Sequence, residues 1–440
     1  MKIFSMLFYL LAYTVVVTAT PVDEFVEAYR KKNDIPGVAL LVIQDGAVRT
    51  SQGYGLANIE HEVPVQPKTI FQSGSIGKQF TATAVMMLVE ENKLQLSDPI
   101  SSYLKVPDSW NGITIRHMLT HTSGLGDYPE SFSLQKDYTE EELLAMITAQ
   151  PLSFSPGQKW SYSNLAYVTL GILIHKISGK FYGDFLKERI FEPAGMKTAR
   201  IISESDIIPN RAAGYTMVDG QLKNQKWVSP TLNTTADGSL YFSIEDLAKW
   251  DAALNGEMLL KKSSLQEMWT PVKLNDGKIE PYGFGWSITK TKSGSRLIEH
   301  GGAWQGFTSH IARYPDDKLT VATLCNLSGC DSTYIAHRVA GIFKRDVGPV
   351  EYKAISMPAS LLKSYEGEYR LEDRLTLKVT ATEQGLLTEL MGDRMQLIPY
   401  AENQFFVEDS ERTFEFVKDQ NGKIKKMILR LPLELTFEKL

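Results

Sequence analysis

The chain contains very little cysteine. Only Cys325 and Cys330 occur among its 440 residues, too few for the disulfide scaffold of a small secreted domain. Cys325 ends the apolar run "LTVATLCN", which is typical of a buried strand, so the sequence favours free thiols over a bridge. Two cysteines without a fitting histidine pair also argue against a zinc site. We therefore expect neither a metal nor a cofactor.

A strong positive charge is also lacking. The formal net charge is −5, and no block of lysine and arginine interrupts the chain. Nucleic acid, which is bound through basic surfaces, is therefore not an expected partner. The contents of 43% hydrophobic and 22% charged residues are those of an ordinary soluble globular protein.

Long hydrophobic runs are scarce as well. The N-terminal apolar stretch from Ile3 to Val17 follows one lysine and is short for a membrane span. Val17-Thr18-Ala19 fits a cleavage site, so residues 1–19 are predicted to be a secretory signal peptide. This predicts a secreted or periplasmic protein with no stable membrane span after cleavage. An uncleaved N-terminal anchor is the alternative.

The length of the chain favours two domains, because one hydrophobic core rarely serves 440 residues. Strand patterns at both ends of residues 20–346 enclose a region of helical patterns, which predicts an α+β domain. Its antiparallel sheet would pair the first hairpin, around Asp45-Gly46, with strands far away in sequence. The predicted helices include 75–93, 114–121, 140–150, 165–179, 182–191 and 244–255, and the later strands are 282–289, 296–302, 308–315 and 319–326.

A different pattern begins after residues 347–358, which are predicted to form a linker. Leu375, Leu377 and Val379 alternate with polar residues, as in a strand with one buried face. Asn421-Gly422 is a strong signal for a tight hairpin turn. Residues 359–440 are therefore predicted to form a small all-β barrel or sandwich.

One of several Ser-x-x-Lys pairs stands out by its surroundings. Ser75 and Lys78 open a segment that is apolar nearly all round, which predicts a buried helix. Residues three apart share a helix face, so the lysine would lie beside the serine. Desolvation there would lower the lysine pKa and allow it to accept the serine proton. The other pairs open no such helix: Ser102/Lys105, Ser133/Lys136, Ser287/Lys290 and Ser360/Lys363.

Two further stretches carry side chains suited to catalysis. "WSYSN" places Tyr162 and Asn164 two residues apart, and "EHGGAWQGF" places His300 at the end of an apolar strand. A Ser-His-Asp hydrolase is disfavoured, because position 73 is serine rather than the first glycine of a G-x-S-x-G elbow. His117 and His121 lie four apart without a third ligand, so core or capping roles are favoured over metal binding.

These motifs, in this order, resemble the serine β-lactamase and penicillin-binding-protein superfamily. The resemblance is greatest to its class C-like and D-aminopeptidase/esterase branch. It covers residues 24 to about 345 and includes "ITIRHMLTHTSGL" (113–125) and "YGFGW" (282–286). It implies an antiparallel sheet flanked by helices with a helical insert, and a lipocalin-like C-terminal β-domain.

The resemblance also implies the catalytic roles. Ser75 would attack a carbonyl and become acylated, and Lys78 would activate it. Tyr162 would share the proton transfer and deliver the proton to the leaving group. Asn164 would hold the lysine and a substrate amide by hydrogen bonds.

The third motif is implied to bind substrate. The backbone N–H groups of Ser75 and Ala303 would form the oxyanion hole, and Gly301 and Gly302 would let substrate lie along the strand edge. Many family members have Lys-Thr-Gly here, where the lysine and the hydroxyl bind a substrate carboxylate. His300 and Gly301 take those places, which puts efficient β-lactam hydrolysis in doubt.

The expected function is an exported serine hydrolase that acts through an acyl-enzyme on small esters, amides or D-amino-acid peptides. A cell-wall D,D-peptidase, a weak β-lactamase and a non-catalytic penicillin-recognising protein remain as alternatives. The expected partner is a small-molecule or peptide substrate, and a homo-oligomer is left open. The β-domain would either control access to the cleft or serve stability and assembly.

Overall fold

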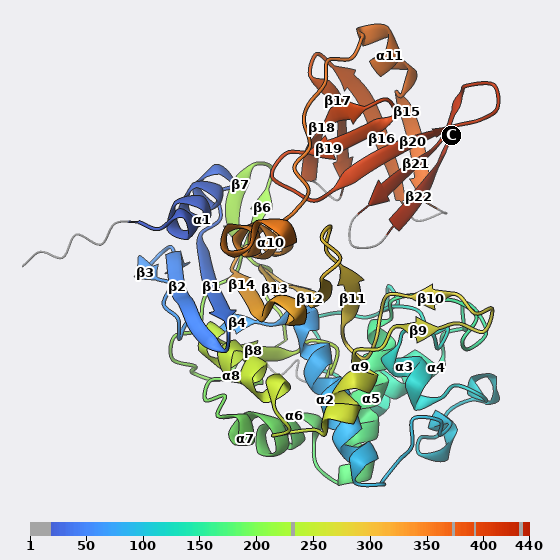
Figure 1. Ribbon diagram of the computed structural model, residues 1–440. Coiled ribbons are helices and arrows are strands. Elements are labelled where there is room, and N and C mark those ends of the chain that lie inside the picture. The colour runs from blue at the N-terminus through green and yellow to red at the C-terminus, as the bar shows by residue number, and fades with distance from the viewer. Residues whose placement is uncertain (1–18, 230–233, 372–374, 391–392, 431–433) are drawn as a thin grey trace, which may run out of the picture.

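The computed structural model describes residues 19–229, 234–371, 375–390, 393–430 and 434–440 (Figure 1). The predicted signal peptide falls on residues 1–19, of which 1–18 lie outside the described residues. Within the described part of the chain, no helix is both long and apolar enough to cross a membrane.

An antiparallel sheet of seven strands forms the centre of the larger body. Its order is β11 (Ser287–Lys290), β12 (Arg296–Trp304), β13 (Phe307–Tyr314), β14 (Leu319–Cys325), β1 (Gly37–Gln44), β2 (Ala47–Asn58) and β3 (Val63–Pro64). The hairpin of β1 and β2 turns at Asp45 and Gly46, and β1 pairs with β14, with Leu41 opposite Ala322. The predicted pairing of the first hairpin with distant strands is therefore confirmed.

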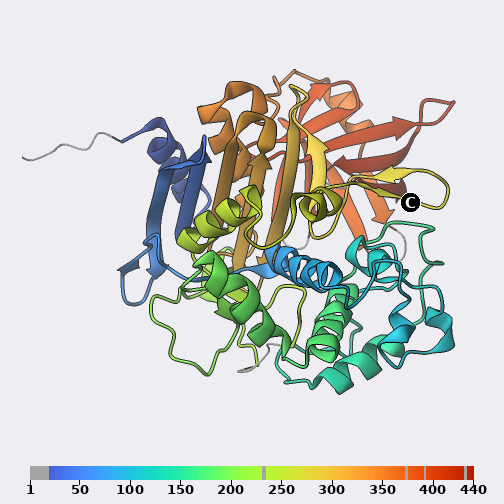
Figure 2. The ribbon, with the colours of Figure 1, turned by 60° about the horizontal axis from the view of Figure 1, so that its bottom comes forward.

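Both faces of this sheet are covered by helices (Figures 1 and 2). On one face, Leu40 packs with residues of α1 (Pro21–Lys32) and α10 (Ser332–Phe343). On the other face, Leu41 joins the larger core that includes α2 (Gly77–Glu90) and α8 (Ile244–Asn255). Burial on both sides explains why the β1 sequence "GVALLVIQ" is apolar throughout instead of alternating.

The helical insert covers the second face. Its other helices and turns are η1 (Gly74–Ile76), η2 (Ile100–Ser102), η3 (Asp108–Trp110), α3 (Ile115–Leu119), α4 (Glu140–Thr148), α5 (Asn164–Ser178), α6 (Tyr182–Leu186), η4 (Lys187–Phe191), α7 (Glu192–Ala194) and α9 (Lys262–Met268). Short strands in this part of the chain are β4 (Phe71–Gln72), β5 (Arg200–Ile201), β8 (Leu240–Phe242), β9 (Val272–Lys273) and β10 (Ile279–Glu280). The hairpin of β6 (Tyr215–Val218) and β7 (Gln221–Asn224) instead packs with the α1 and α10 core, as does η6 (Arg345–Val347), and η5 (Pro315–Asp317) lies between β13 and β14.

Two predicted elements differ in the structure. The predicted helix 75–93 is a 3₁₀ turn, η1, followed by α2, so Ser75 lies in the turn before the α-helix. The predicted strand 282–289 is regular only from Ser287, because Gly285 adopts φ +74°. A Cβ atom at Gly285 would lie 2.9 Å from the Lys78 carbonyl oxygen, so this segment packs against α2 where a strand was expected.

The C-terminal part is a closed barrel of eight antiparallel strands, which confirms the predicted all-β fold. After α11 (Ala359–Ser364) the strands are β15 (Gly367–Leu371), β16 (Leu375–Thr382), β17 (Gly385–Leu390), β18 (Asp393–Ala401), β19 (Gln404–Val407), β20 (Thr413–Lys418), β21 (Ile424–Arg430) and β22 (Glu434–Lys439). Leu377 and Val379 are buried in its core, as their alternation predicted. Gly422 adopts φ +78° in the turn between β20 and β21.

The barrel contacts the α1 and α10 side of the larger body (Figure 1). The contacts come from the segment between β19 and β20. Lys32 of α1 forms ion pairs with Asp409 at 2.6 Å and with Glu408 at 3.0 Å. Asp331, which caps α10, accepts a hydrogen bond from the Ser410 hydroxyl at 3.1 Å. Cys325 and Cys330 are both buried, and their thiols are free in the structure.

Candidate active site

Lys78 connects the parts of the site predicted from the motifs. Its Nζ atom lies 3.1 Å from Ser75 Oγ, 2.7 Å from Asn164 Oδ1 and 2.8 Å from the Asp237 carbonyl oxygen. The side chain is fully buried, at the second position of α2. Three oxygen atoms therefore surround one buried amine.

This arrangement suits a general base. An amide oxygen and a backbone carbonyl can only accept hydrogen bonds, so they occupy two N–H groups of Lys78. Once Lys78 is neutral, its lone pair takes the third position and faces the Ser75 hydroxyl. Burial lowers the pKa of Lys78 to about 8, and the charges of Asp237 and Asp127 oppose the shift.

Asn164 is held in the orientation that this contact needs. Its Nδ2 donates to both Asp127 carboxylate oxygens, at 3.0 and 3.1 Å, which leaves Oδ1 facing Lys78. Asn164 is the first residue of α5, and Ser163 caps that helix through a bond from Ala166 N. The motif "WSYSN" thus places a helix start beside the lysine.

The aromatic ring of Tyr162 packs against the Lys78 amine. The Lys78 Nζ atom is 4.8 Å from the centroid of its ring. Its hydroxyl is buried and makes no hydrogen bond in the described residues. Burial raises the pKa of Tyr162 well above its usual range, while the nearby Ser75 hydroxyl opposes the shift. The phenol therefore keeps its proton until the charge beside it changes.

A buried carboxylate, Asp237, completes the polar surroundings. Its side chain is 5% exposed, and burial raises its pKa to about 6 although the Lys78 charge lowers it. The Tyr128 hydroxyl helps to hold the ionised form. Asp127 and Asp237 thus place two negative charges near Lys78.

Three glycines allow β12 and η1 to approach each other closely. A Cβ atom at Gly302 would lie 2.2 Å from the Ser73 carbonyl oxygen and 3.0 Å from Ser75 N. A Cβ atom at Gly74, where φ is +52°, would lie 2.5 Å from Ala303 N. A Cβ atom at Gly238, in the chain before β8, would lie 2.6 Å from the Gly74 carbonyl oxygen. The backbone N–H groups of residues 75 and 303 are therefore neighbours.

His300 belongs to a chain of hydrogen bonds with a defined direction. Ser163 N–H donates to His121 Nδ1 at 3.0 Å, so His121 Nε2 carries a proton for Tyr282 Oη at 3.2 Å. The Tyr282 hydroxyl then donates to His300 Nε2 at 2.9 Å, and His300 Nδ1 donates to the Gly301 carbonyl at 2.6 Å. Burial and the Lys78 charge lower the pKa of His300 to about 3. His300 is therefore neutral, with both nitrogens engaged.

A cleft of about 800 Å³ opens at Ser75. Its lining includes Asn164, Asp237 and Ala303, and apolar side chains such as those of Phe132 and Leu134. His300 and Gly301 line a separate cavity of about 380 Å³ with Tyr162 and Tyr282. The Lys78 amine thus lies next to Ser75, Tyr162 and Asn164, three of the residues predicted from the motifs. Gly302 and Ala303 lie where β12 comes close to η1. His300 and Gly301 line the second cavity instead, and Tyr162 reaches both places.

Four polar residues of the site were not predicted from the motifs. Asp127 follows the family-like segment that ends at Leu125, and Tyr282 begins another such segment, so both had a local signal. Tyr128 had none beyond its place next to Asp127, and Asp237 lies in a polar stretch without periodicity. Their positions depend on chain packing around Lys78.

Comparisons with known families cover nearly the whole described chain. The family described as "Beta-lactamase" matches residues 22–341. The family described as "Domain of unknown function (DUF3471)" matches residues 351–440. The first match contains every residue of the site above, and the second contains the barrel.

Three individual proteins are similar to this chain over much of its length. Penicillin-binding protein 4* of Bacillus subtilis is 29% identical over 422 residues, covering 90% of this chain and 93% of its own. The D-aminopeptidase of Gluconobacter oxydans is 28% identical over 300 residues, which cover 66% of this chain and 56% of that protein. The octameric penicillin-binding protein homologue from Pyrococcus abyssi has a TM-score of 0.69 and 27% identity, covering 95% of this chain and 99% of its own.

Proposed function

The chain belongs to the beta-lactamase family, and on that premise we propose that it is a serine hydrolase working through an acyl-enzyme on Ser75. The observation that carries the proposal is the surroundings of Lys78. Two acceptor oxygens occupy two of its N–H groups, so the neutral amine presents its lone pair to Ser75 Oγ at 3.1 Å. The N-terminal pattern supports the further proposal that the protein is exported.

In the proposed first step, Ser75 Oγ bonds to the substrate carbonyl carbon while its proton moves to Lys78 Nζ. The positive charge that forms on Lys78 lies beside the Tyr162 ring and favours proton movement through that phenol. As the bond from the carbonyl carbon to the leaving amine or alcohol breaks, Tyr162 gives its proton to that group and takes the extra proton of Lys78 in return, so both side chains are neutral again. Water attacks the acyl-enzyme in the second step, and the same groups take its proton.

Backbone groups complete the proposed mechanism. The carbonyl oxygen becomes negative as the carbon turns tetrahedral, and the N–H groups of Ser75 and Ala303 would stabilise it. The close packing at Gly74 and Gly302 supports this pairing, because it brings those two N–H groups together. Losing one such donor typically costs about 3 kcal/mol of transition-state stabilisation.

We propose that preferred substrates carry a free ammonium group, as D-aminoacyl amides and esters do. When Lys78 is neutral, it no longer supplies a positive charge to balance the negative charges of Asp127 and Asp237. An ammonium in the cleft would restore the balance. His300 is neutral and buried in the chain of hydrogen bonds, so it offers no cation for the carboxylate of a β-lactam. The D-aminopeptidase relative supports the same substrate class.

A panel of four substrates tests this proposal. D-alanine p-nitroanilide should be cleaved at least about 10-fold faster, as kcat/KM, than its N-acetyl derivative, because acetylation removes the charge. p-Nitrophenyl acetate measures acyl transfer without an ammonium group, and nitrocefin measures β-lactam hydrolysis. Fastest turnover of nitrocefin would contradict the proposed substrate class while leaving the nucleophile untouched. Failure to turn over any member would contradict the hydrolase itself.

Activity is expected to rise with pH. Lys78 must be neutral to accept the Ser75 proton, and with a pKa of about 8 only about one amine in ten is neutral at pH 7. With p-nitrophenyl acetate, which carries no ammonium group of its own, the plot of kcat/KM should therefore rise between pH 6 and 9 with a midpoint near 8.

Asp237→Asn gives this pH dependence a structural test. The Asp237 carboxylate raises the Lys78 pKa, so its removal should move the midpoint to lower pH. Asp184→Asn, on the exposed side of α6, is the matched control and should leave the midpoint unchanged. If the midpoint pH stays unchanged in Asp237→Asn, or moves upward, Lys78 is not the titrating base.

We also propose that residues 359–440 form an autonomous β-domain, joined by the linker 347–358, that supplies no catalytic group. Among the described residues, the cleft lining runs from Gly74 to Ser328 and includes none from the barrel. This favours a role in assembly over control of access within one chain. The octameric relative supports the same role.

Truncation after residue 350 tests the role of the barrel. The shortened protein should remain folded, still become acylated at Ser75 and elute as a smaller oligomer with unchanged substrate preference. A shift in preference for bulky or peptidic substrates would instead support gating. A folded truncation that cannot be acylated would show that the barrel helps to build the catalytic centre.

A further inference from the structure

A second cluster of titratable side chains lies between the strands β12 and β13 and the helix α10. Glu299 of β12 is within hydrogen-bond distance of two histidines: Glu299 Oε2 lies 2.9 Å from His310 Nε2 on β13 and 2.6 Å from His337 Nε2 on α10. The three side chains are at most 9% exposed. One ligand atom from each lies within 4.8 Å of the other two.

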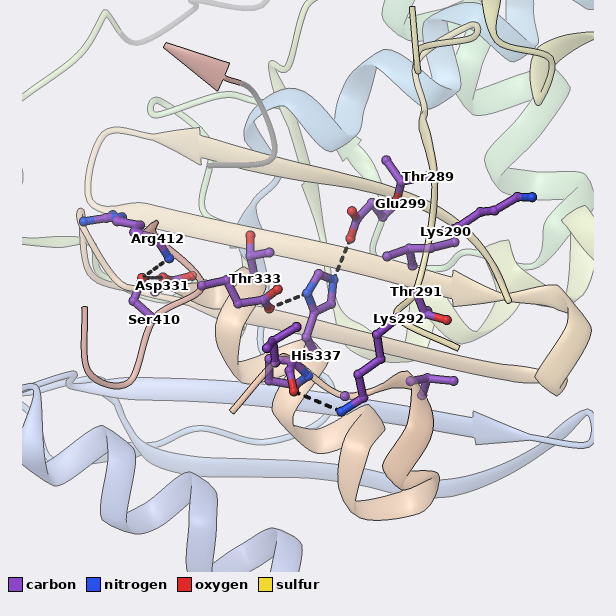
Figure 3. A pocket seen from close by; sticks show the side chains of 16 residues that line it. Thr289, Lys290, Thr291, Lys292, Glu299, Asp331, Thr333, His337, Ser410 and Arg412 are labelled. Carbon is purple, nitrogen blue, oxygen red and sulfur yellow. Dashed lines mark hydrogen bonds and ion pairs between the residues drawn. The ribbon is translucent and has the colours of Figure 1, made fainter. Parts of the chain in front are cut away.

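The register of the sheet brings these residues together. Gly301 is opposite His310 in the pairing of β12 with β13, and Glu299, two residues before Gly301, lies on the same face. A Cβ atom at Gly301 would lie 3.3 Å from His310 Nδ1, so glycine leaves the imidazole its space. His337 reaches the same face from α10, and Figure 3 shows its ring directed toward Glu299.

Each histidine is also fixed through its other ring nitrogen. His337 Nδ1 is 2.5 Å from Glu411 Oε1, a carboxylate of the barrel. His310 Nδ1 is 3.0 Å from Thr333 Oγ1 of α10. A carboxylate or hydroxyl on the far nitrogen is the usual support of a metal-binding histidine, because it fixes the ring and its tautomer. Both Nε2 atoms thus converge on one carboxylate.

The charges of the cluster call for a cation at its centre. Glu299 brings a carboxylate into the buried part of the cluster, and Glu411, whose side chain is 37% exposed, adds a second carboxylate beside His337. Buried carboxylates need a compensating charge. Either a proton between Nε2 and Oε2 or a metal ion in its place can supply that charge.

We propose that Glu299, His310 and His337 bind a divalent transition-metal ion of the zinc type, with Glu411 and Thr333 orienting the two imidazoles. Two histidines and one carboxylate are a known zinc ligand set. Ligand atoms of a tetrahedral zinc ion lie about 3.3 Å apart, so the contacts at 2.6 and 2.9 Å need to open by roughly half an ångström. The ion takes the place of the protons that lie between Nε2 and Oε2.

A cavity gives access to this site and room for a fourth ligand. It measures about 400 Å³ and is lined by Glu299 and His337 together with Asp331, Ser410 and Glu411 (Figure 3). A water molecule in it can complete the tetrahedron. The bound ion would join β12, β13 and α10 directly, and the barrel would be linked to it through the contact of Glu411 with His337. The metal site does not depend on the proposed chemistry at Ser75.

Metal content of the full chain is the test. The protein, made without a histidine tag, is stripped with a chelator, exposed to zinc, desalted and assayed by mass spectrometry for metal. We expect about one zinc per chain, and the visible absorption of a tetrahedral site when Co²⁺ replaces zinc. Glu299→Gln and His337→Gln should each lose the zinc and the absorption. Ser75→Ala should keep both.

Two further variants separate binding from folding. Glu411 lies on the barrel and is partly exposed, so Glu411→Gln should fold and weaken metal affinity by about 10- to 100-fold. His175→Gln is the matched control, because His175 pairs with Glu140 at 2.7 Å on the surface and should leave metal binding unchanged. Wild type that retains no more zinc than Glu299→Gln would overturn the proposal, as would equal loss in His175→Gln or undiminished affinity in Glu411→Gln.

Discussion

Ser75→Ala should reduce ester and amide turnover to the uncatalysed background, a loss of about 10⁴-fold or more in kcat. The alanine leaves no atom that can bond to the substrate carbonyl carbon, and Lys78 then has no hydroxyl to activate. The purified variant should keep the thermal unfolding temperature of the wild type within a few degrees, because only one small hydroxyl is lost. Steady-state kinetics on p-nitrophenyl acetate and D-alanine p-nitroanilide measure the loss.

Matched serine variants serve as controls for this result. Ser102→Ala and Ser360→Ala remove exposed serines that also precede a lysine by three residues. No side-chain hydrogen bond joins Ser102 to Lys105 or Ser360 to Lys363 in the described residues, so their turnover should equal that of the wild type. Ester turnover that survives in purified Ser75→Ala protein would refute the assignment of the nucleophile.

Lys78→Ala and Tyr162→Phe should each lower kcat by about 10³-fold, and the double variant should be little worse than either. Non-additive losses are expected because both side chains move the same proton. The Lys78 amine lies over the Tyr162 ring at 4.8 Å, and the buried phenol can release its proton only next to a charged lysine. The four proteins of the cycle are compared under saturating substrate.

The control for this cycle is a second lysine over a tyrosine ring. Lys439 lies 5.3 Å from the centroid of the Tyr369 ring, in the barrel. Lys439→Ala should leave kcat unchanged and should combine additively with Tyr162→Phe. If the losses from Lys78→Ala and Tyr162→Phe simply multiply, the two residues serve separate steps and the shared proton path is wrong.

Sequence patterns predicted much of the fold because burial leaves a local signature. The apolar surface of α2 and the alternation of Leu377 and Val379 identified a buried helix and a barrel strand. The 3₁₀ turn at Ser75 could not be read in the same way. It follows from Gly74, whose positive φ and close contact with Ala303 depend on a strand more than 200 residues away.

The candidate site was predictable only where family-like motifs occur. Asp237 carries no motif, and its carbonyl meets Lys78 because the chain before β8 packs against α2. The cluster of Glu299, His310 and His337 also escaped prediction from residue spacing. His310 and His337 are 11 and 38 residues away from Glu299 in the sequence. Only the register of the sheet and the packing of α10 bring the three side chains together.

Covalent trapping shows directly whether Ser75 is the nucleophile. The wild-type protein is treated with a fluorophosphonate, which bonds to activated serines, and the labelled peptide is identified by mass spectrometry. We predict one adduct per chain, on the peptide that contains Ser75, with loss of hydrolysis in proportion to labelling and no adduct in Ser75→Ala or Lys78→Ala. Hydrolysis that continues with Ser75 fully labelled, or an adduct on another residue that abolishes turnover, would contradict the account.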